Sequence, residues 1–146
     1  MTSDAQAPSL EARFECRVHW GDCDPAGIIF YPTYFRWMDA ATWAFWELVG
    51  FDAQRLRDEH RTMPLVSADC HFLAPARQGD RCVVRSRIGR FGGKSFVVLH
   101  EIGRSDGVAL AKGSETRVWG RYQSGPGSPM KGEPIGEDVK RLFRPR

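Results

Sequence analysis

The chain has 146 residues, of which 42% are hydrophobic and 12% aromatic, so we expect one domain over residues 1–146, with peripheral ends at 1–11 and about 122–146. A net charge of +3 is too small to indicate a nucleic-acid partner. The N-terminus has no basic start followed by an apolar run, so we expect no signal peptide. No apolar stretch approaches the ~18 residues of a membrane span, so no membrane partner is expected.

The first half of the chain predicts one strand followed by one long helix. Polar and apolar residues alternate over 12–18, which is the pattern of a strand. After a turn-rich loop, the segment 32–50 begins with proline and ends with glycine, residues that suit the two ends of a helix. Its only charged residues are Arg36, Asp39 and Glu47. Because apolar residues lie on nearly every side, we expect this helix to be buried all round.

The second half predicts mainly strands. A charged segment at 52–61 suits a short helix, and the expected strands cover 65–73, 81–89, 95–102 and 108–119, with a hairpin turn at 91–94. After residue 122 the sequence predicts a loop with a short helix near 137–143. One helix followed by a run of strands is an α+β pattern. The free sheet edge and leftover apolar surface predict dimerisation through an edge strand.

The strongest chemical signal lies in the loop before the helix. Two carboxylates, Asp22 and Asp24, lie in a loop with proline and glycine that leads directly into the helix start. A helix start offers free backbone N–H groups and a partial positive charge, which can hold a developing oxyanion. A carboxylate near the same carbonyl can attack it or activate a water. The residues alone leave open the alternative that these aspartates only organise the turn.

The run GDCDPAGIIFYP, followed by RWMDAA, resembles the 4-hydroxybenzoyl-CoA thioesterase family of hotdog-fold enzymes. Weaker similarity continues through PLVSADCHF and KSFVVLHEI, so the resemblance covers roughly residues 12–120. It implies an α+β hotdog fold, in which a curved antiparallel sheet wraps around one long buried helix. It also implies hydrolysis of an acyl-CoA thioester to free acid and CoA, with a benzoyl or hydroxybenzoyl acyl group.

The resemblance also implies roles for individual residues. The family's catalytic aspartate falls on Asp24, as nucleophile or general base, and the helix amide that polarises the thioester carbonyl falls on Tyr31. The family's lysine near the hairpin falls on Lys94, followed by Ser95 as in the family pattern. The site is implied to lie at a subunit interface of a homodimer or homotetramer, with the pantetheine arm of the acyl-CoA substrate between subunits.

A basic segment precedes and includes the hairpin. Between residues 77 and 94 one acid, Asp80, accompanies six basic residues: Arg77, Arg81, Arg85, Arg87, Arg90 and Lys94. The residues alone are consistent with a solvated strand face or with a surface for a polyanion such as a nucleotide phosphate. Glycines 92 and 93 stand where a member of the family carries two arginines. We therefore expect the CoA phosphates to contact Arg85, Arg87 or Arg90 as well as Lys94.

Asp39 is the further polar candidate on the helix. It lies eight positions after Tyr31, which is about 12 Å along a helix axis. A phenyl ring held beyond a thioester reaches such a depth, so one hypothesis is that Asp39 accepts a hydrogen bond from a ring hydroxyl. The alternative is an ion pair with Arg36, three positions earlier.

Other classes of function are less well supported by the sequence. The four histidines and four cysteines show no metal-ligand spacing, so we expect no metal and no cofactor, CoA being part of the substrate. The scattered cysteines suggest a reducing cytoplasm. A hotdog hydratase needs a histidine near the helix start, and none occurs between residues 22 and 50. Two alternatives remain open: a short-chain aliphatic acyl-CoA thioesterase and a non-catalytic acyl-CoA-binding protein.

Overall fold

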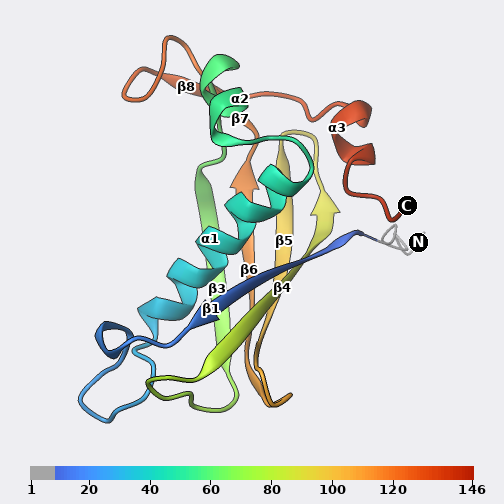
Figure 1. Cartoon of the computed structure of the whole chain (residues 1–146). Coiled ribbons are helices and arrows are strands. Elements are labelled where there is room, and N and C mark those ends of the chain that lie inside the picture. The colour runs from blue at the N-terminus through green and yellow to red at the C-terminus, as the bar shows by residue number, and fades with distance from the viewer. Residues whose placement is uncertain (1–8) are drawn as a thin grey trace.

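The computed structural model describes residues 9–146, so most of the peripheral N-terminal segment expected at 1–11 lies outside the described residues. One long helix, α1 (Pro32–Leu48), crosses one face of a curved five-stranded antiparallel sheet (Figure 1). This arrangement confirms the predicted α+β hotdog architecture.

The large sheet has the strand order β1-β4-β5-β6-β3. Its strands are β1 (Glu11–Arg17), β4 (Arg81–Phe91), β5 (Ser95–Arg104), β6 (Ala109–Val118) and β3 (Leu65–Phe72). All five were predicted, with differences of a few residues at their ends. Strand β4 runs two residues further than predicted, and the turn that follows is closed by a hydrogen bond from the Gly92 N–H to the Ser95 carbonyl, 2.7 Å long.

Smaller elements gather beside the C-terminal end of α1. They are α2 (Ala53–Asp58), β2 (Arg61–Thr62), β7 (Gly120–Tyr122), β8 (Met130–Gly132) and α3 (Glu137–Arg141). The three short strands form a second sheet in the order β2-β7-β8. The sequence correctly predicted α2 and α3, but it predicted a loop where β8 lies, because three residues are too few to show a strand alternation.

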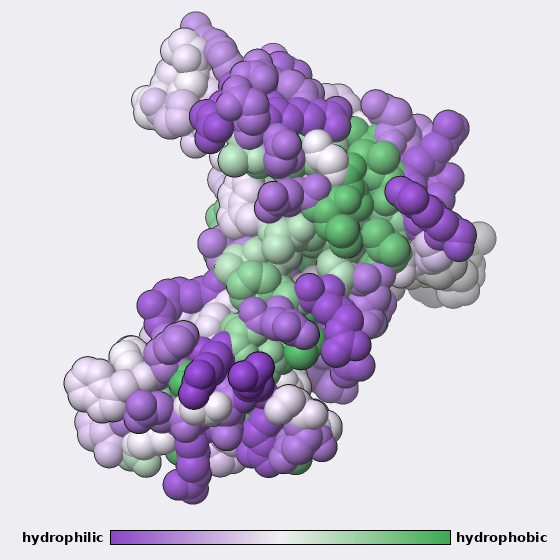
Figure 2. Space-filling view, viewed as in Figure 1, coloured by the Kyte–Doolittle hydropathy of each residue, from purple (hydrophilic) through white to green (hydrophobic). Residues whose placement is uncertain are grey.

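Helix α1 buries one face, whereas the sequence predicted burial on every side. Its buried residues recur three or four positions apart: Thr33, Tyr34, Trp37, Met38, Ala41, Thr42, Phe45 and Trp46. On the other side Asp39 and Glu47 are exposed and Trp43 is half-buried. Figure 2 shows apolar surface along the line of α1. One sheet face covers one helix face, so residues 9–146 leave the apolar residues on the other side of α1 uncovered.

Helix α1 packs tightly against Gly113 of β6. A side-chain Cβ at this position would lie 2.5 Å from the Met38 Sδ and 2.6 Å from the Asp69 carbonyl oxygen. Both distances are shorter than real carbon contacts, so only glycine lets the helix pack at this depth.

The C-terminal residues contribute to the core, although the sequence placed them at the periphery. Phe143 is 2% exposed and packs edge-on against Phe45 and Trp46, with ring centroids 5.0 and 4.7 Å apart. Ile135 and Val139 are buried in the same cluster. The last segment therefore closes the end of the molecule where α1 finishes.

Strand β3 forms one edge of the large sheet and carries exposed apolar side chains. Leu65, Val66 and Phe72 of this strand are each at least half exposed, as is Leu73 just after it. An apolar edge strand is a surface that another strand readily covers. Among residues 9–146, no helix is long and apolar enough to cross a membrane.

Candidate active site

The loop before α1 is held in place by Asp22. Its Oδ2 accepts a hydrogen bond from the His19 backbone N–H at 2.8 Å, and its Oδ1 accepts one from Arg36 at 3.1 Å. The Asp22 carbonyl accepts further hydrogen bonds from the Phe30 N–H and the Thr33 hydroxyl. Asp22 therefore ties both sides of the loop to the first turn of the helix.

Asp24 begins the tight turn inside this loop. Its Oδ1 accepts a hydrogen bond from the Ala26 N–H at 2.8 Å, and its carbonyl accepts one from the Gly27 N–H at 2.9 Å. Gly27 has a φ of +79°, which favours glycine. One oxygen of the carboxylate thus organises the turn, which is the role that the alternative interpretation of the sequence gave to Asp24. Its Oδ2 accepts no hydrogen bond from residues 9–146, and the side chain is half-buried.

The start of α1 leaves one backbone N–H without a partner. Thr33 donates its N–H to the Phe30 carbonyl and Tyr34 donates its N–H to the Tyr31 carbonyl, while Pro32 has no N–H. The Tyr31 N–H finds no acceptor within the described part of the chain. Proline at the first position of the helix therefore isolates the Tyr31 amide as the free donor of this terminus.

Asp24 and Tyr31 thus belong to one hydrogen-bonded loop, anchored to the core by Ile29, which is 5% exposed. The loop presents a free carboxylate oxygen and a free N–H donor at the positive end of the α1 dipole. A donor in this position can hold the oxygen of a polarised carbonyl. A carboxylate can attack the carbonyl carbon or take a proton from water. A carboxylate and an N–H donor are together the groups that transfer of an acyl group to water requires.

Asp39 lies on the uncovered face of α1, and its side chain is 55% exposed. The alternative in which Asp39 pairs with Arg36 is wrong, because Arg36 pairs with Asp22. The Asp39 Oδ1 instead accepts hydrogen bonds from Arg117 at 2.6 Å and from the Trp43 indole at 3.3 Å.

A buried polar cluster beneath α1 was not predicted from the sequence. Glu115 accepts hydrogen bonds from Arg117 and from the Thr42 hydroxyl, and it lies 2.9 Å from the His100 ring, whose other nitrogen is 2.7 Å from Ser86. All five residues are buried. Burial raises the pKa of Glu115, but hydrogen bonds from His100, Arg117 and Thr42 outweigh it and lower the pKa to about 2.

One signal in the sequence points to this cluster. Alternate residues of β6 lie on the sheet face toward α1: Ala111, Gly113, Glu115 and Arg117. The residues of β5 on the same face are Phe96, Val98, His100 and Ile102. Charged residues at inward positions of a strand are rare and are paired when they occur. The alternation therefore identifies Glu115 and Arg117 as buried charged residues. It does not identify the residues they pair with, because those depend on the register between the strands.

The hairpin residues Lys94 and Ser95 lie far from the Asp24 loop within one chain. Phe96, which follows them, packs on Trp46 near the C-terminal end of α1, with ring centroids 4.9 Å apart. The loop with Asp24 lies at the other end of the helix, about 25 Å away along 17 residues. Lys94 is exposed and Ser95 is half-buried.

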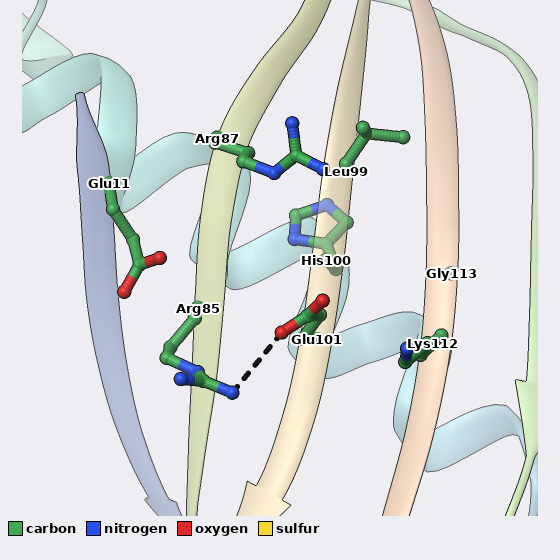
Figure 3. Close-up of a pocket in the computed structure, with 8 residues that line it drawn as sticks. All are labelled: Glu11, Arg85, Arg87, Leu99, His100, Glu101, Lys112 and Gly113. Carbon is green, nitrogen blue, oxygen red and sulfur yellow. Dashed lines mark hydrogen bonds and ion pairs between the residues drawn. The ribbon is translucent and has the colours of Figure 1, made fainter. Parts of the chain in front are cut away.

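The three arginines expected near the CoA phosphates lie on the outer face of the sheet, opposite α1. Arg85 and Arg87 line a hollow of about 370 Å³, in which Arg85 pairs with Glu101 at 3.1 Å (Figure 3). A bulge between Ile88 and Arg90 returns Arg90 to the same face. One chain therefore does not bring these arginines to Asp24.

The cysteines and the described metal-ligating residues do not form an alternative centre. Burial raises the pKa of Cys16 to about 12 and those of Cys70 and Cys82 to about 11, which keeps them as thiols. The Cys23 thiol donates to the His19 carbonyl. Within the described range, no group of three or more histidine, cysteine or acidic side chains is arranged to hold a metal ion.

Comparison with known proteins identifies relatives of this chain. Residues 18–143 match the model of the thioesterase-like superfamily. The 4-hydroxybenzoyl-CoA thioesterase of Pseudomonas sp. (strain CBS-3) is 33% identical over 110 residues, which cover 70% of this chain and 78% of that protein.

Solved structures agree with this relationship. The structure of the Pseudomonas enzyme superposes with a TM-score of 0.82 at 28% identity and covers 91% of this chain and 99% of that one. A gentisyl-coenzyme A thioesterase superposes with a TM-score of 0.78 at 35% identity, covering 88% of this chain and 99% of that one. The chain therefore belongs to the thioesterase-like superfamily, within the 4-hydroxybenzoyl-CoA thioesterase family, and is a hotdog-fold acyl-CoA thioesterase.

Proposed function

We propose that this enzyme hydrolyses the CoA thioester of a hydroxylated aromatic acid, with Asp24 and the Tyr31 N–H as its catalytic groups. The observation that carries the proposal is the free Tyr31 N–H at the start of α1, in the same loop as the free Oδ2 of Asp24. The N–H binds the thioester oxygen as negative charge develops on it.

Asp24 serves in one of two routes. As a nucleophile, its Oδ2 bonds to the carbonyl carbon while the carbon–sulfur bond breaks and CoA leaves as a thiolate; water then hydrolyses the mixed anhydride. As a general base, Asp24 takes a proton from the water that attacks the same carbon, and the carbon–sulfur bond then breaks so that CoA leaves as a thiolate. Both routes yield the free acid and CoA.

An aryl acyl group is favoured by two observations. The relatives described above are named for 4-hydroxybenzoyl and gentisyl thioesters, whose rings both bear hydroxyl groups. Asp39 offers an acceptor on the uncovered face of α1, about 12 Å along the axis and roughly a quarter turn from Tyr31. We propose that Asp39 accepts the ring hydroxyl.

We propose that the working enzyme is a homodimer or a pair of such dimers, with the site at a subunit interface. The apolar edge of β3 and the uncovered face of α1 both need a partner. Asp24 and Lys94 lie at opposite ends of α1. Two protomers with antiparallel helices would therefore bring the Asp24 of one near the Lys94 of the other, with the pantetheine arm between them.

For the nucleotide of CoA we propose contacts with Lys94 and Ser95 at the hairpin. Arg85, Arg87 and Arg90 form the second proposed contact region, since all three lie on one face of the sheet and two of them line a hollow. Phosphate binding at either place depends on exposed charges, so it weakens as salt increases.

We further propose that hydrolysis needs no metal or organic cofactor and takes place in the cytoplasm. The catalytic groups proposed here are a carboxylate and a backbone amide, which need no metal. The four cysteines are free, which suits a reducing compartment. Turnover that persists in excess chelator would support the first part of this proposal, and its loss would refute it.

The deciding experiment is a measurement of kcat/KM for 4-hydroxybenzoyl-, benzoyl-, butyryl- and palmitoyl-CoA with the purified protein. We expect 4-hydroxybenzoyl-CoA to be the best of the four. An aliphatic thioester that is better by about tenfold, or about 1.4 kcal/mol of transition-state stabilisation, would favour the short-chain alternative. Hydrolysis of none of the four would refute the proposed aryl substrate.

A further inference from the structure

One oxygen of the Asp39 carboxylate is fixed, and the other is free. The Arg117 guanidinium and the Trp43 indole both donate to Oδ1, while Oδ2 accepts no hydrogen bond from the described residues. Asp39 is nevertheless more than half exposed. An exposed aspartate normally samples several rotamers, so two donors to a single oxygen select one orientation for the group.

Arg117 is itself fixed by buried acceptors on the side away from Asp39. Its side chain is 3% exposed, and one terminal nitrogen donates to the Met63 carbonyl at 2.9 Å. The other terminal nitrogen donates to Glu115 at 2.7 Å as well as to Asp39. The guanidinium is planar and rigid, so these contacts fix the nitrogen that reaches Asp39.

Glu115 is fixed in turn by the interior of the protein. It is 2% exposed and is contacted by Thr42 of α1 and His100 of β5. The chain of contacts from His100 through Glu115 and Arg117 to Asp39 therefore joins the packed core to a single carboxylate on the surface of the helix.

Stability alone does not account for this arrangement. Removing charged groups from water costs several kcal/mol for each ion, and apolar residues of similar volume often serve stability as well or better. An exposed pair such as Arg85 and Glu101 needs no such support. A buried chain that ends on a half-exposed acceptor is instead suited to positioning that acceptor.

We propose that Arg117 and Glu115 are positioning residues that hold Asp39 so that its free Oδ2 receives a hydroxyl on the acyl ring, and that they thereby set the preference for hydroxylated aryl thioesters. This inference rests on the proposed aryl-CoA hydrolysis. A hydrogen bond to a charged group contributes about 1.5–3 kcal/mol. We therefore expect kcat/KM for 4-hydroxybenzoyl-CoA to exceed that for benzoyl-CoA by about 10- to 150-fold.

The test is a double-mutant cycle on this preference ratio. Asp39→Ala should bring the ratio close to one. Arg117→Lys keeps the positive charge but loses the planar guanidinium with its two terminal nitrogens. It should lower the ratio several-fold while kcat/KM for benzoyl-CoA changes little. Arg117→Lys should have no further effect on the ratio in the Asp39→Ala background, since Arg117 acts through Asp39.

Two controls separate positioning from general damage. Arg104→Lys changes an arginine that pairs with Asp106 on the surface, and it should leave the ratio unchanged. If Arg117→Lys folds poorly, the double variant Glu115→Gln with Arg117→Met removes both buried charges together, leaves neither unpaired, and should lower the ratio to the same extent.

The ratio also distinguishes failure of this inference from failure of the proposed function. A wild-type enzyme that hydrolyses both aryl thioesters equally, or an Arg117→Lys variant that slows both by the same factor, would overturn the positioning role and leave aryl-CoA hydrolysis standing. A wild-type enzyme that hydrolyses neither would overturn the proposed function, and the positioning role would fall with it.

Discussion

The two ends of α1 are built on different principles. At its C-terminal end Trp46 is fully buried, and its ring lies within 5.5 Å of the ring centroids of Phe51, Phe96, Trp119 and Phe143. At its N-terminal end the Tyr31 N–H and the Asp24 Oδ2 have no partner among residues 9–146. One end maximises contact between apolar rings, and the other end leaves polar groups available.

The difference shows how one helix serves both the fold and the site. Aromatic packing at one end fixes the position of the whole helix, including its first turn. The first turn can then keep an unpaired donor, because its position does not depend on that donor. Changes at the C-terminal end should therefore alter stability, and changes at the N-terminal end should alter turnover.

The largest effect on turnover is expected for Asp24→Asn. The amide is nearly isosteric, but it is a poor nucleophile and a poor base, so kcat should fall by about 10²–10⁴-fold or more. The amide oxygen can still accept from the Ala26 N–H, so the melting temperature should change little. Steady-state kinetics and a thermal melt measure the two quantities. Wild-type turnover in this variant would remove Asp24 from the mechanism.

At the opposite end, Trp46→Ala should destabilise the protein without a comparable loss of chemistry. Truncation of a fully buried tryptophan costs about 3–5 kcal/mol. Trp46→Phe should cost less, because it keeps a ring and removes the indole N–H, which has no partner in the described part of the chain. Urea unfolding gives the free energies, and kcat per folded molecule should stay within about tenfold of wild type. A deep loss of kcat in the folded enzyme would contradict the division between the two ends.

A smaller effect is expected for Asp22→Asn. Asp22 supports the loop through the His19 N–H and Arg36, so the substitution should lower stability by about 1 kcal/mol. Turnover should fall less than about tenfold, since no catalytic group is removed. The same kinetic assay compares it with Asp24→Asn. An equal loss in both variants, at normal stability, would reverse the roles of the two aspartates.

The smallest effect is expected for Lys94→Ala at the hairpin. Contacts with phosphates far from the reacting carbon bind substrate and transition state alike, so KM should rise while kcat stays unchanged. An exposed charge contributes about 0.2–1 kcal/mol, which corresponds to a rise of up to about fivefold that shrinks in high salt. A KM that is unchanged at low salt would place the nucleotide contact elsewhere.

Local features were predictable from the sequence, and non-local ones were not. The loop and the start of α1 could be predicted because Asp24, Pro32 and the residues between them act on near neighbours. The contact between Arg117 and Asp39 could not, because it depends on where β6 passes beneath α1. The uncovered face of α1 was wrongly expected to be buried, since an apolar helix surface carries no sign of whether its own chain or another covers it.

The most direct test of the account compares two substitutions at Tyr31. Tyr31→Ala keeps the backbone N–H and removes the ring, whereas Tyr31→Pro removes the ring and the N–H. The φ of Tyr31 is −53°, which lies within the range of proline, and its N–H has no partner in residues 9–146 to lose. With both variants folded, we predict that kcat of Tyr31→Pro falls about 10²–10³-fold below that of Tyr31→Ala, the loss expected for one oxyanion donor. Equal kcat values in the two variants would contradict the assignment of the Tyr31 N–H to the thioester oxygen.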